Sequence, residues 1–129
     1  MRFTFDHFRT PTKSEDVITA HRENRRVHPR AAVISYFTES THNDPALHWH
    51  GEHGPSPRPD IEERAALAER ELADSAGGYV DIHAWFFTPD TFRALIQSLT
   101  AAREIPLAID HLYNTPQGNN EFNVVLRKT

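Results

Sequence analysis

The sequence predicts a single α+β domain, residues 1–129, in which three or four helices pack on a small, largely antiparallel sheet of three or four strands. Three observations support this fold class. The 129 residues, 38% hydrophobic and 25% charged, are enough for one modest core and too apolar to stay disordered. Apolar residues recur at helical spacing in several stretches. Near the C-terminus they alternate in two stretches separated by a turn sequence.

The first two helices are expected in the N-terminal third of the chain. Thr12 and Glu15 have the spacing of a capping box, which predicts a helix over residues 13–25. Pro29 fits the first position of a second helix, because proline lacks the amide hydrogen that this position leaves unpaired. Apolar side chains then follow at helical spacing: Ala31, Ile34 and Phe37. The β-branched Val33 and Ile34 leave a strand as the alternative here.

Two further helices have clear start signals. Asp60 and Glu63 repeat the capping-box spacing before a helix expected over residues 61–74, which is rich in strong helix formers. Thr88 is a good N-cap, and Pro89 fits the first helical position after it. The apolar residues that follow Pro89 occupy one face of a helix: Phe92, Leu95, Ile96 and Leu99.

Four stretches have the alternation of strands. Residues 107–113 and 121–127 are expected to pair as a hairpin, because the loop between them contains Pro116 and Gly118. Residues 2–6 and 79–84 also alternate, and we expect them to add strands to the sheet. The stretch over about 39–60 contains four prolines and two glycines, which predicts a long, mobile surface loop.

Composition excludes several functional classes. There is no cysteine, so disulfides and thiolate chemistry are excluded. The net charge of −4 and the absence of a basic stripe with interleaved aromatics argue against a nucleic-acid partner. Without a run of about 20 apolar residues or an apolar signal core, we expect no membrane association and a cytoplasmic location.

Both ends of the chain resemble one known family. The start reads Arg2-Phe3-Thr4-Phe5-Asp6-His7-Phe8-Arg9, and Tyr79-Val80-Asp81-Ile82-His83-Ala84-Trp85-Phe86-Phe87-Thr88-Pro89 leads into the last helix and the hairpin. This succession resembles the C-terminal part of class I S-adenosylmethionine-dependent methyltransferases, in an uncharacterised branch of that superfamily. The resemblance covers most of the chain and implies the C-terminal part of a Rossmann-like methyltransferase fold.

The resemblance implies that this chain holds the part of the fold that faces the substrate and lacks the part that binds the cofactor. In that fold the donor lies on glycine-rich loops that follow parallel strands, and none of the five glycines here lies in a G-x-G pattern after a strand. We therefore expect no cofactor-binding residue and no cofactor in isolation. S-adenosylmethionine would bind, and methyl transfer proceed, only if a separate methyltransferase N-terminal chain completed the fold.

The candidate site residues follow from the same resemblance. The segment after the fifth strand of that fold faces the transferred methyl group, which makes Asp6 and His7 candidate catalytic residues. His83, just before the last helix, is a third. The expected substrate-binding residues are Phe5, Arg9 and Trp85. Each has a simpler interpretation: Asp6 and His7 as a turn at a strand end, and His83 and Trp85 as a half-buried packing face.

The stretch His48-Trp49-His50-Gly51-Glu52-His53 is the other conspicuous feature. Imidazole nitrogens suit zinc, nickel or copper, so His48, His50 and His53 are candidate ligands for Zn or Ni. A real site needs converging ligands with fixed tautomers, and the alternative is a solvated loop that scavenges metal.

Three functions remain open from the sequence. The first is a methyltransferase-like C-terminal domain, inactive alone, that contributes a substrate-side or oligomerisation surface. The second is a non-enzymatic dimeric protein-interaction module, and the third is a histidine-loop metal-binding protein. Because a sheet strand would have lost its neighbour, an exposed edge predicts a homodimer.

Overall fold

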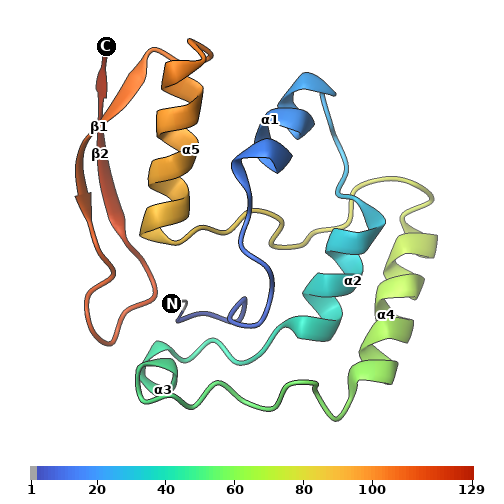
Figure 1. The fold of residues 1–129 in the computed structure, drawn as a ribbon. Helices are drawn as coiled ribbons and strands as arrows, with labels where there is room; N and C mark the ends of the chain where they lie inside the picture. The colour runs from blue at the N-terminus through green and yellow to red at the C-terminus, as the bar shows by residue number, and fades with distance from the viewer. Residues whose placement is uncertain (1–2) are drawn as a thin grey trace.

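The computed structural model describes residues 3–129 and shows an α+β fold with five helices and one two-stranded antiparallel sheet (Figure 1). The elements in chain order are α1 (Ser14–Arg22), α2 (Arg30–Glu39), α3 (Pro45–Trp49), α4 (Ile61–Asp74), α5 (Pro89–Ala101), β1 (Leu107–Tyr113) and β2 (Asn123–Lys128). No helix formed by residues 3–129 combines the length and apolar character needed to cross a membrane.

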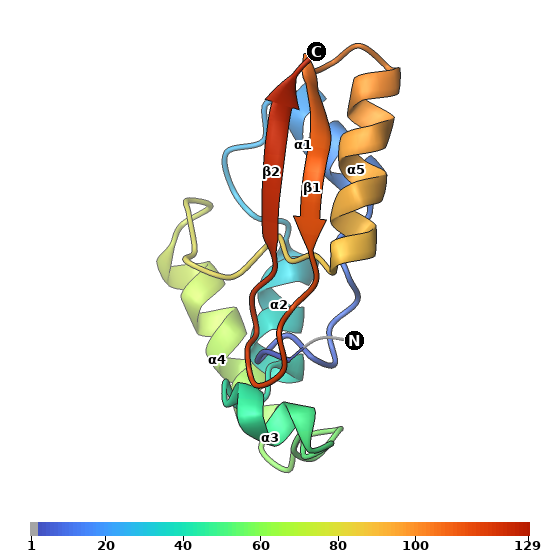
Figure 2. The same cartoon turned by 90° about the vertical axis from the view of Figure 1, so that its left-hand side faces the viewer.

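The elements form two packed groups joined by extended chain. Helix α5 packs against β1, and α1 contacts α5, while α2 pairs with α4. Figure 1 shows the hairpin and α5 on one side and the α2–α4 pair on the other, and Figure 2 shows α5 alongside the hairpin. The segment over residues 79–88 runs between the two groups and contributes to both.

The buried core lies where the α2–α4 pair meets this connecting segment. Val33 and Ala68 have no exposed surface, and Val80 and Ile82 are each 8% exposed. The alternation over residues 79–84 is therefore real, because its even-numbered apolar residues face the core and Tyr79, Asp81 and His83 do not. Residues 79–84 nevertheless pair with no strand, so this expected strand is a buried, extended connection.

The C-terminal elements agree with the sequence prediction. Thr88 caps α5, accepting a hydrogen bond from the Thr91 amide at 3.2 Å, and Pro89 is the first helical residue. Helix α5 buries Leu95 and Ile96. Strands β1 and β2 pair antiparallel from Leu107↔Lys128 to Tyr113↔Asn123, with an irregularity in register between Ile109 and His111.

The N-terminal strand predicted over residues 2–6 is wrong for the residues that the structure describes. Residues 4–9 form consecutive turns, held by hydrogen bonds from the His7 amide to the Thr4 carbonyl and from the Arg9 amide to the Asp6 carbonyl. Arg2 lies outside the described residues. The sheet over residues 3–129 has two strands instead of the expected three or four.

Two predicted capping boxes are also wrong, although the helices after them exist. Thr12 forms no cap for α1, which begins after Lys13. Its hydroxyl accepts from the Phe86 amide at 3.0 Å, and its own amide donates to the Phe86 carbonyl at 3.2 Å. Asp60 precedes α4 but binds Arg58 and Arg64 instead of backbone amides. The capping oxygen is therefore occupied in both cases, by the backbone of Phe86 for Thr12 and by arginine side chains for Asp60.

The stretch over residues 39–60, predicted as a loop, contains a short helix. It contains α3, which begins at Pro45 and is capped by the Asp44 carboxylate, which accepts from the amides of Ala46 and Leu47 at 2.9 and 3.2 Å. The Trp49 indole donates to the Asn119 carbonyl at 2.8 Å, which ties α3 to the hairpin loop. The stretch is therefore packed against the rest of the protein at several points.

Candidate functional site

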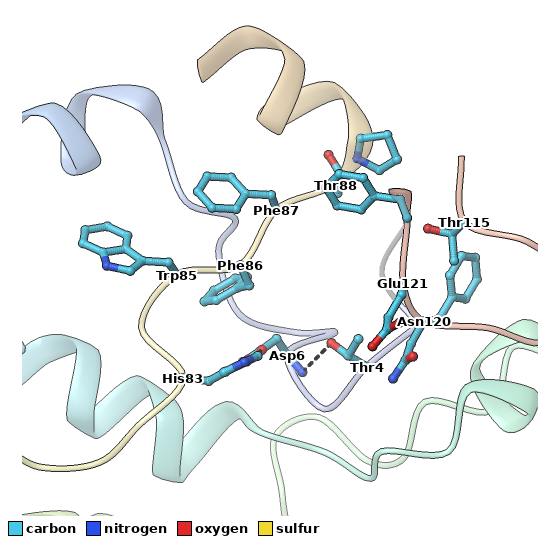
Figure 3. A pocket seen from close by; sticks show the side chains of 13 residues that line it. Thr4, Asp6, His83, Trp85, Phe86, Phe87, Thr88, Thr115, Asn120 and Glu121 are labelled. Atoms are coloured by element: carbon cyan, nitrogen blue, oxygen red, sulfur yellow. Dashed lines mark hydrogen bonds and ion pairs between the residues drawn. The ribbon is translucent and has the colours of Figure 1, made fainter. Parts of the chain in front are cut away.

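A cleft of roughly 300 Å³ lies between the N-terminal turns, the connecting segment and the hairpin loop. Much of its wall is aromatic. The lining residues are Phe3, Thr4, Asp6, His83, Trp85, Phe86, Phe87, Thr88, Pro89, Thr115, Asn120, Glu121 and Phe122. Figure 3 shows Asp6 and His83 together on one side, with Asn120 and Glu121 reaching in from the hairpin loop on the other. An apolar wall with a few convergent polar groups is the usual form of a small-molecule site.

An aspartate–histidine pair is the chemical centre of this cleft. Asp6 is 1% exposed, and its Oδ2 lies 2.8 Å from Nδ1 of His83. The His83 side chain is 57% exposed, so its ring joins a buried carboxylate to the open cleft. A carboxylate can only accept, so the neutral His83 ring donates its Nδ1 hydrogen and carries its lone pair on Nε2.

Arg9 neutralises and orients the buried carboxylate. One of its terminal nitrogens donates to Oδ1 of Asp6 at 2.5 Å and to the His83 carbonyl at 2.7 Å, and its Nε lies 3.3 Å from the Ser35 hydroxyl. The guanidinium lies over two aromatic rings, with Cζ 4.6 Å from the centre of Phe86 and 5.5 Å from that of Tyr36. Arg9 therefore fixes the aspartate and the backbone that carries the histidine at the same time.

Local structure explains why Asp6 and His83 meet although they are 77 positions apart in the sequence. The turns over residues 4–9 direct Asp6 inward, and its amide donates to the Thr4 hydroxyl at 3.1 Å. The two hydrogen bonds between Thr12 and Phe86 hold the connecting segment beside the N-terminal segment. The ring of Phe5 lies 4.9 Å from the His83 ring and supports it from the side.

The structure brings three of the predicted site residues to one cleft and places the others elsewhere. Asp6, His83 and Trp85 line it together. Phe5 and Arg9, expected to bind substrate, do not line this cleft. Phe5 packs on the His83 ring, and Arg9 is buried, with 2% of its surface exposed. His7, expected as a catalytic candidate, is also not a lining residue, and it joins a cluster of histidines instead.

This histidine cluster is the second candidate site, and we define it as His7, His48 and His53. One nitrogen from each lies within 4.8 Å of the other two. The Nδ1 atoms of His48 and His53 are 2.9 Å apart. His50, predicted as a ligand, is exposed at the end of α3 and is not in the cluster. In the structure, His7 therefore takes the place of His50 in the predicted set of metal ligands.

The surroundings of the histidine cluster favour neutral rings. Burial lowers the pKa of His48, which is 1% exposed, although the hydrogen bond to the His42 carbonyl opposes this. Burial also lowers the pKa of His53, and the neighbouring His7 lowers it further. A charged imidazolium loses its hydration in such a place, and further positive charge nearby repels it.

Three side chains of the cleft have no site signal in the sequence. Asn120 lies in the predicted hairpin loop, whereas Glu121 and Phe122 begin the predicted second strand, which in the structure starts only at Asn123. Their approach to Asp6 depends on tertiary contacts, such as the Phe92–Phe122 ring pair at 5.8 Å. Comparison with protein-family models, curated proteins and solved structures finds no match to this chain.

Proposed function

We propose that the chain is the substrate-side part of a methyltransferase-like enzyme, in which the Asp6–His83 pair removes a proton from the acceptor. The observation that carries the proposal is the buried Asp6 carboxylate, 2.8 Å from Nδ1 of an exposed histidine in an aromatic cleft. The resemblance predicts Asp6 and His83 on the substrate side, and their meeting in one cleft supports that prediction.

The chemistry of this chain is proton transfer and positioning. With Asp6 accepting from Nδ1, the Nε2 lone pair of His83 receives the acceptor's proton, and the buried carboxylate stabilises the imidazolium that forms. Aromatic walls favour a flat ring, and Asn120 and Glu121 offer polar groups opposite His83. A small phenol, with an acidic hydroxyl on an aromatic ring, matches this combination.

The residues described do not fit the methyl donor, so we assign this chain no part in holding it. In the methyltransferase fold the donor lies at the ends of parallel strands, and the sheet over residues 3–129 is an antiparallel pair. We propose that the parent sheet is Rossmann-like and that the partner is a separate N-terminal chain.

The test separates acceptor binding from donor binding. In the chain alone, a titration with phenol or catechol, followed by nuclear magnetic resonance, is expected to shift the resonances of His83, Trp85 and Phe122 saturably. Calorimetry with S-adenosylmethionine is expected to show binding only after an N-terminal methyltransferase half is added. His83→Ala is then expected to lower methyl transfer by about 10²–10⁴-fold, the usual contribution of a general base.

His111 supplies a matched control for this test. It forms an aspartate–histidine pair with Asp110 at 2.9 Å, and it is exposed and does not line the cleft. His111→Ala is expected to leave phenol binding and methyl transfer unchanged. Equal losses of methyl transfer in His83→Ala and His111→Ala, or the absence of a saturable shift of the cleft resonances, would contradict the proposed function.

A second candidate is a dimeric protein-interaction module, favoured by the outer surface of the hairpin. Tyr113 and Val125, which share one face of the hairpin, are 55% and 47% exposed. If a second copy paired with the hairpin along its sheet edge, the contact would form a homodimer. Light scattering at micromolar concentration tests this, and Val125→Lys is expected to give a monomer if the hairpin is the contact.

A further inference from the structure

We propose that His7, His48 and His53 form a binding site for one divalent transition metal of the zinc class. The site goes beyond the proposed proton transfer, because none of the three side chains lines the aromatic cleft. Its ligands come from three places in the fold. His7 lies in the N-terminal turns, His48 lies in α3, and His53 lies in the loop that follows.

His48 has the surroundings of a metal ligand. Its Nε2 donates to the His42 carbonyl at 3.0 Å, which assigns the hydrogen to Nε2 and leaves the Nδ1 lone pair directed at His53. Histidine ligands in proteins commonly donate their second ring nitrogen to a carbonyl or carboxylate, which fixes the tautomer and the ring direction. This partner is present in the fold, and His48 is 1% exposed, so its direction is set by packing.

The backbone that carries His53 is also held in place. The Thr41 hydroxyl donates to the His53 carbonyl, and the His42 ring donates from Nε2 to the Glu52 carbonyl at 2.8 Å. Gly54 follows at φ +80°, and a Cβ there would come within 2.7 Å of the Thr41 hydroxyl. The ligand-bearing loop therefore has fixed anchor points on both sides of His53.

Metal binding requires the His48 and His53 nitrogens to move slightly apart, the more distant ligand atoms to approach, and one ring to turn. Tetrahedral zinc with bonds of about 2.0–2.1 Å places its ligand atoms about 3.3 Å apart, compared with 2.9 Å for the His48–His53 pair and up to 4.8 Å for the three together. His7 stacks on His53 with ring centres 3.6 Å apart, so its ring must turn to point at the same ion. His7 is only partly buried, which leaves room for this turn.

Three imidazoles define the class of metal. Neutral imidazole nitrogen suits Zn²⁺, Ni²⁺ and Cu²⁺, whereas Mg²⁺ and Ca²⁺ prefer oxygen ligands. The metal would join the N-terminal turns to the stretch over residues 39–60. Since His7 directly follows Asp6, the same ion would also restrain the turn that carries the buried carboxylate. Three protein ligands leave one position of a tetrahedral ion to water.

The test uses the full chain, stripped of metal with a chelator and titrated with Zn²⁺ and Co²⁺. We expect one equivalent to bind, with the visible absorption of tetrahedral Co²⁺. X-ray absorption of the Zn²⁺ complex is expected to show imidazole nitrogens at about 2.0–2.1 Å. His53→Ala and His7→Ala are expected to weaken metal binding by at least about tenfold. Loss of a residue that only supports a ligand already weakens binding by about 10–100-fold, and loss of the ligand itself should weaken it at least as much. Both side chains are partly exposed, so both variants are expected to fold.

His50→Ala is the matched control, because His50 lies in the same stretch but outside the cluster. It is expected to bind metal as the unmodified chain does, and Zn²⁺ is expected to raise the melting temperature of both. The proposal is overturned if no stoichiometric binding is found, or if His53→Ala binds normally. An equal loss in His50→Ala would show adventitious capture by exposed histidines and would also overturn it.

Discussion

Removal of the Asp6 carboxylate should destabilise the protein far more than removal of an exposed one. In Asp6→Ala the Arg9 guanidinium, 2% exposed, loses its counter-ion in a buried place. Breaking a buried pair in this way costs about 3–5 kcal/mol, a large share of a total stability of about 5–15 kcal/mol. At about 4 °C per kcal/mol for a domain of this size, the melting temperature should fall by about 12–20 °C.

Asp110 provides the comparison. Its carboxylate pairs with Arg127 at 3.9 Å, and the two side chains are 43% and 61% exposed. Such surface pairs contribute about 0–1 kcal/mol, so Asp110→Ala should shift the urea midpoint only slightly. The double variant Asp6→Ala/Arg9→Met removes the orphaned charge and should be more stable than Asp6→Ala alone. Equal losses for Asp6→Ala and Asp110→Ala, or simple additivity in the double variant, would refute this reasoning.

Three further predictions concern single positions. Burial lowers the pKa of His28, and its buried Nε2 finds no hydrogen-bond partner among the described residues. The folded state therefore takes up this proton less readily than the unfolded state. The protein therefore has its full stability above about pH 6.5 and loses stability as the pH falls. Between pH 7.5 and 5.5 the melting temperature should fall less steeply in His28→Gln than in the unmodified protein, because glutamine takes up no proton. Gly54→Ala should cost more than Gly51→Ala, by about the 0.5–1.5 kcal/mol of one hydrogen bond, because both have positive φ but only Gly54 adjoins the Thr41 hydroxyl; equal urea midpoints would contradict this. Thr88→Ala should lose about 1 kcal/mol through the cap of α5, and an unchanged midpoint would show that the cap is dispensable.

Local signals determined the parts of the fold that the sequence predicts well. Helix α4 has the predicted bounds of residues 61–74, and α5 begins at Pro89 as its Thr88-Pro89 signal indicates. The hairpin follows from two alternating stretches and a turn. In each case residues close in the sequence carry the information, so no tertiary contact is needed to read it.

The remaining features depend on contacts that a sequence pattern does not contain. Thr12 has the right spacing for a cap, but it binds the backbone of Phe86, 74 residues away. Alternation over residues 79–84 predicts a strand, and the structure shows that helices can bury one side of an extended segment without any strand beside it.

The candidate sites show the same division. Residue types predict which side chains could transfer a proton or bind a metal, as Asp6, His83, His48 and His53 illustrate. Their grouping depends on the fold: His7 is next to Asp6 in the chain, yet it points to the histidine cluster rather than to the cleft. The turns over residues 4–9 direct the side chains of these two neighbours to different places.

The protonation pattern of the His83 ring tests the central claim most directly. Nitrogen-15 resonances of the neutral imidazole should show the hydrogen on Nδ1 and the lone pair on Nε2, and the tautomer should reverse in Asp6→Asn, whose amide can donate to Nδ1. A hydrogen on Nε2 in the unmodified protein, or an unchanged ring in Asp6→Asn, would contradict the account.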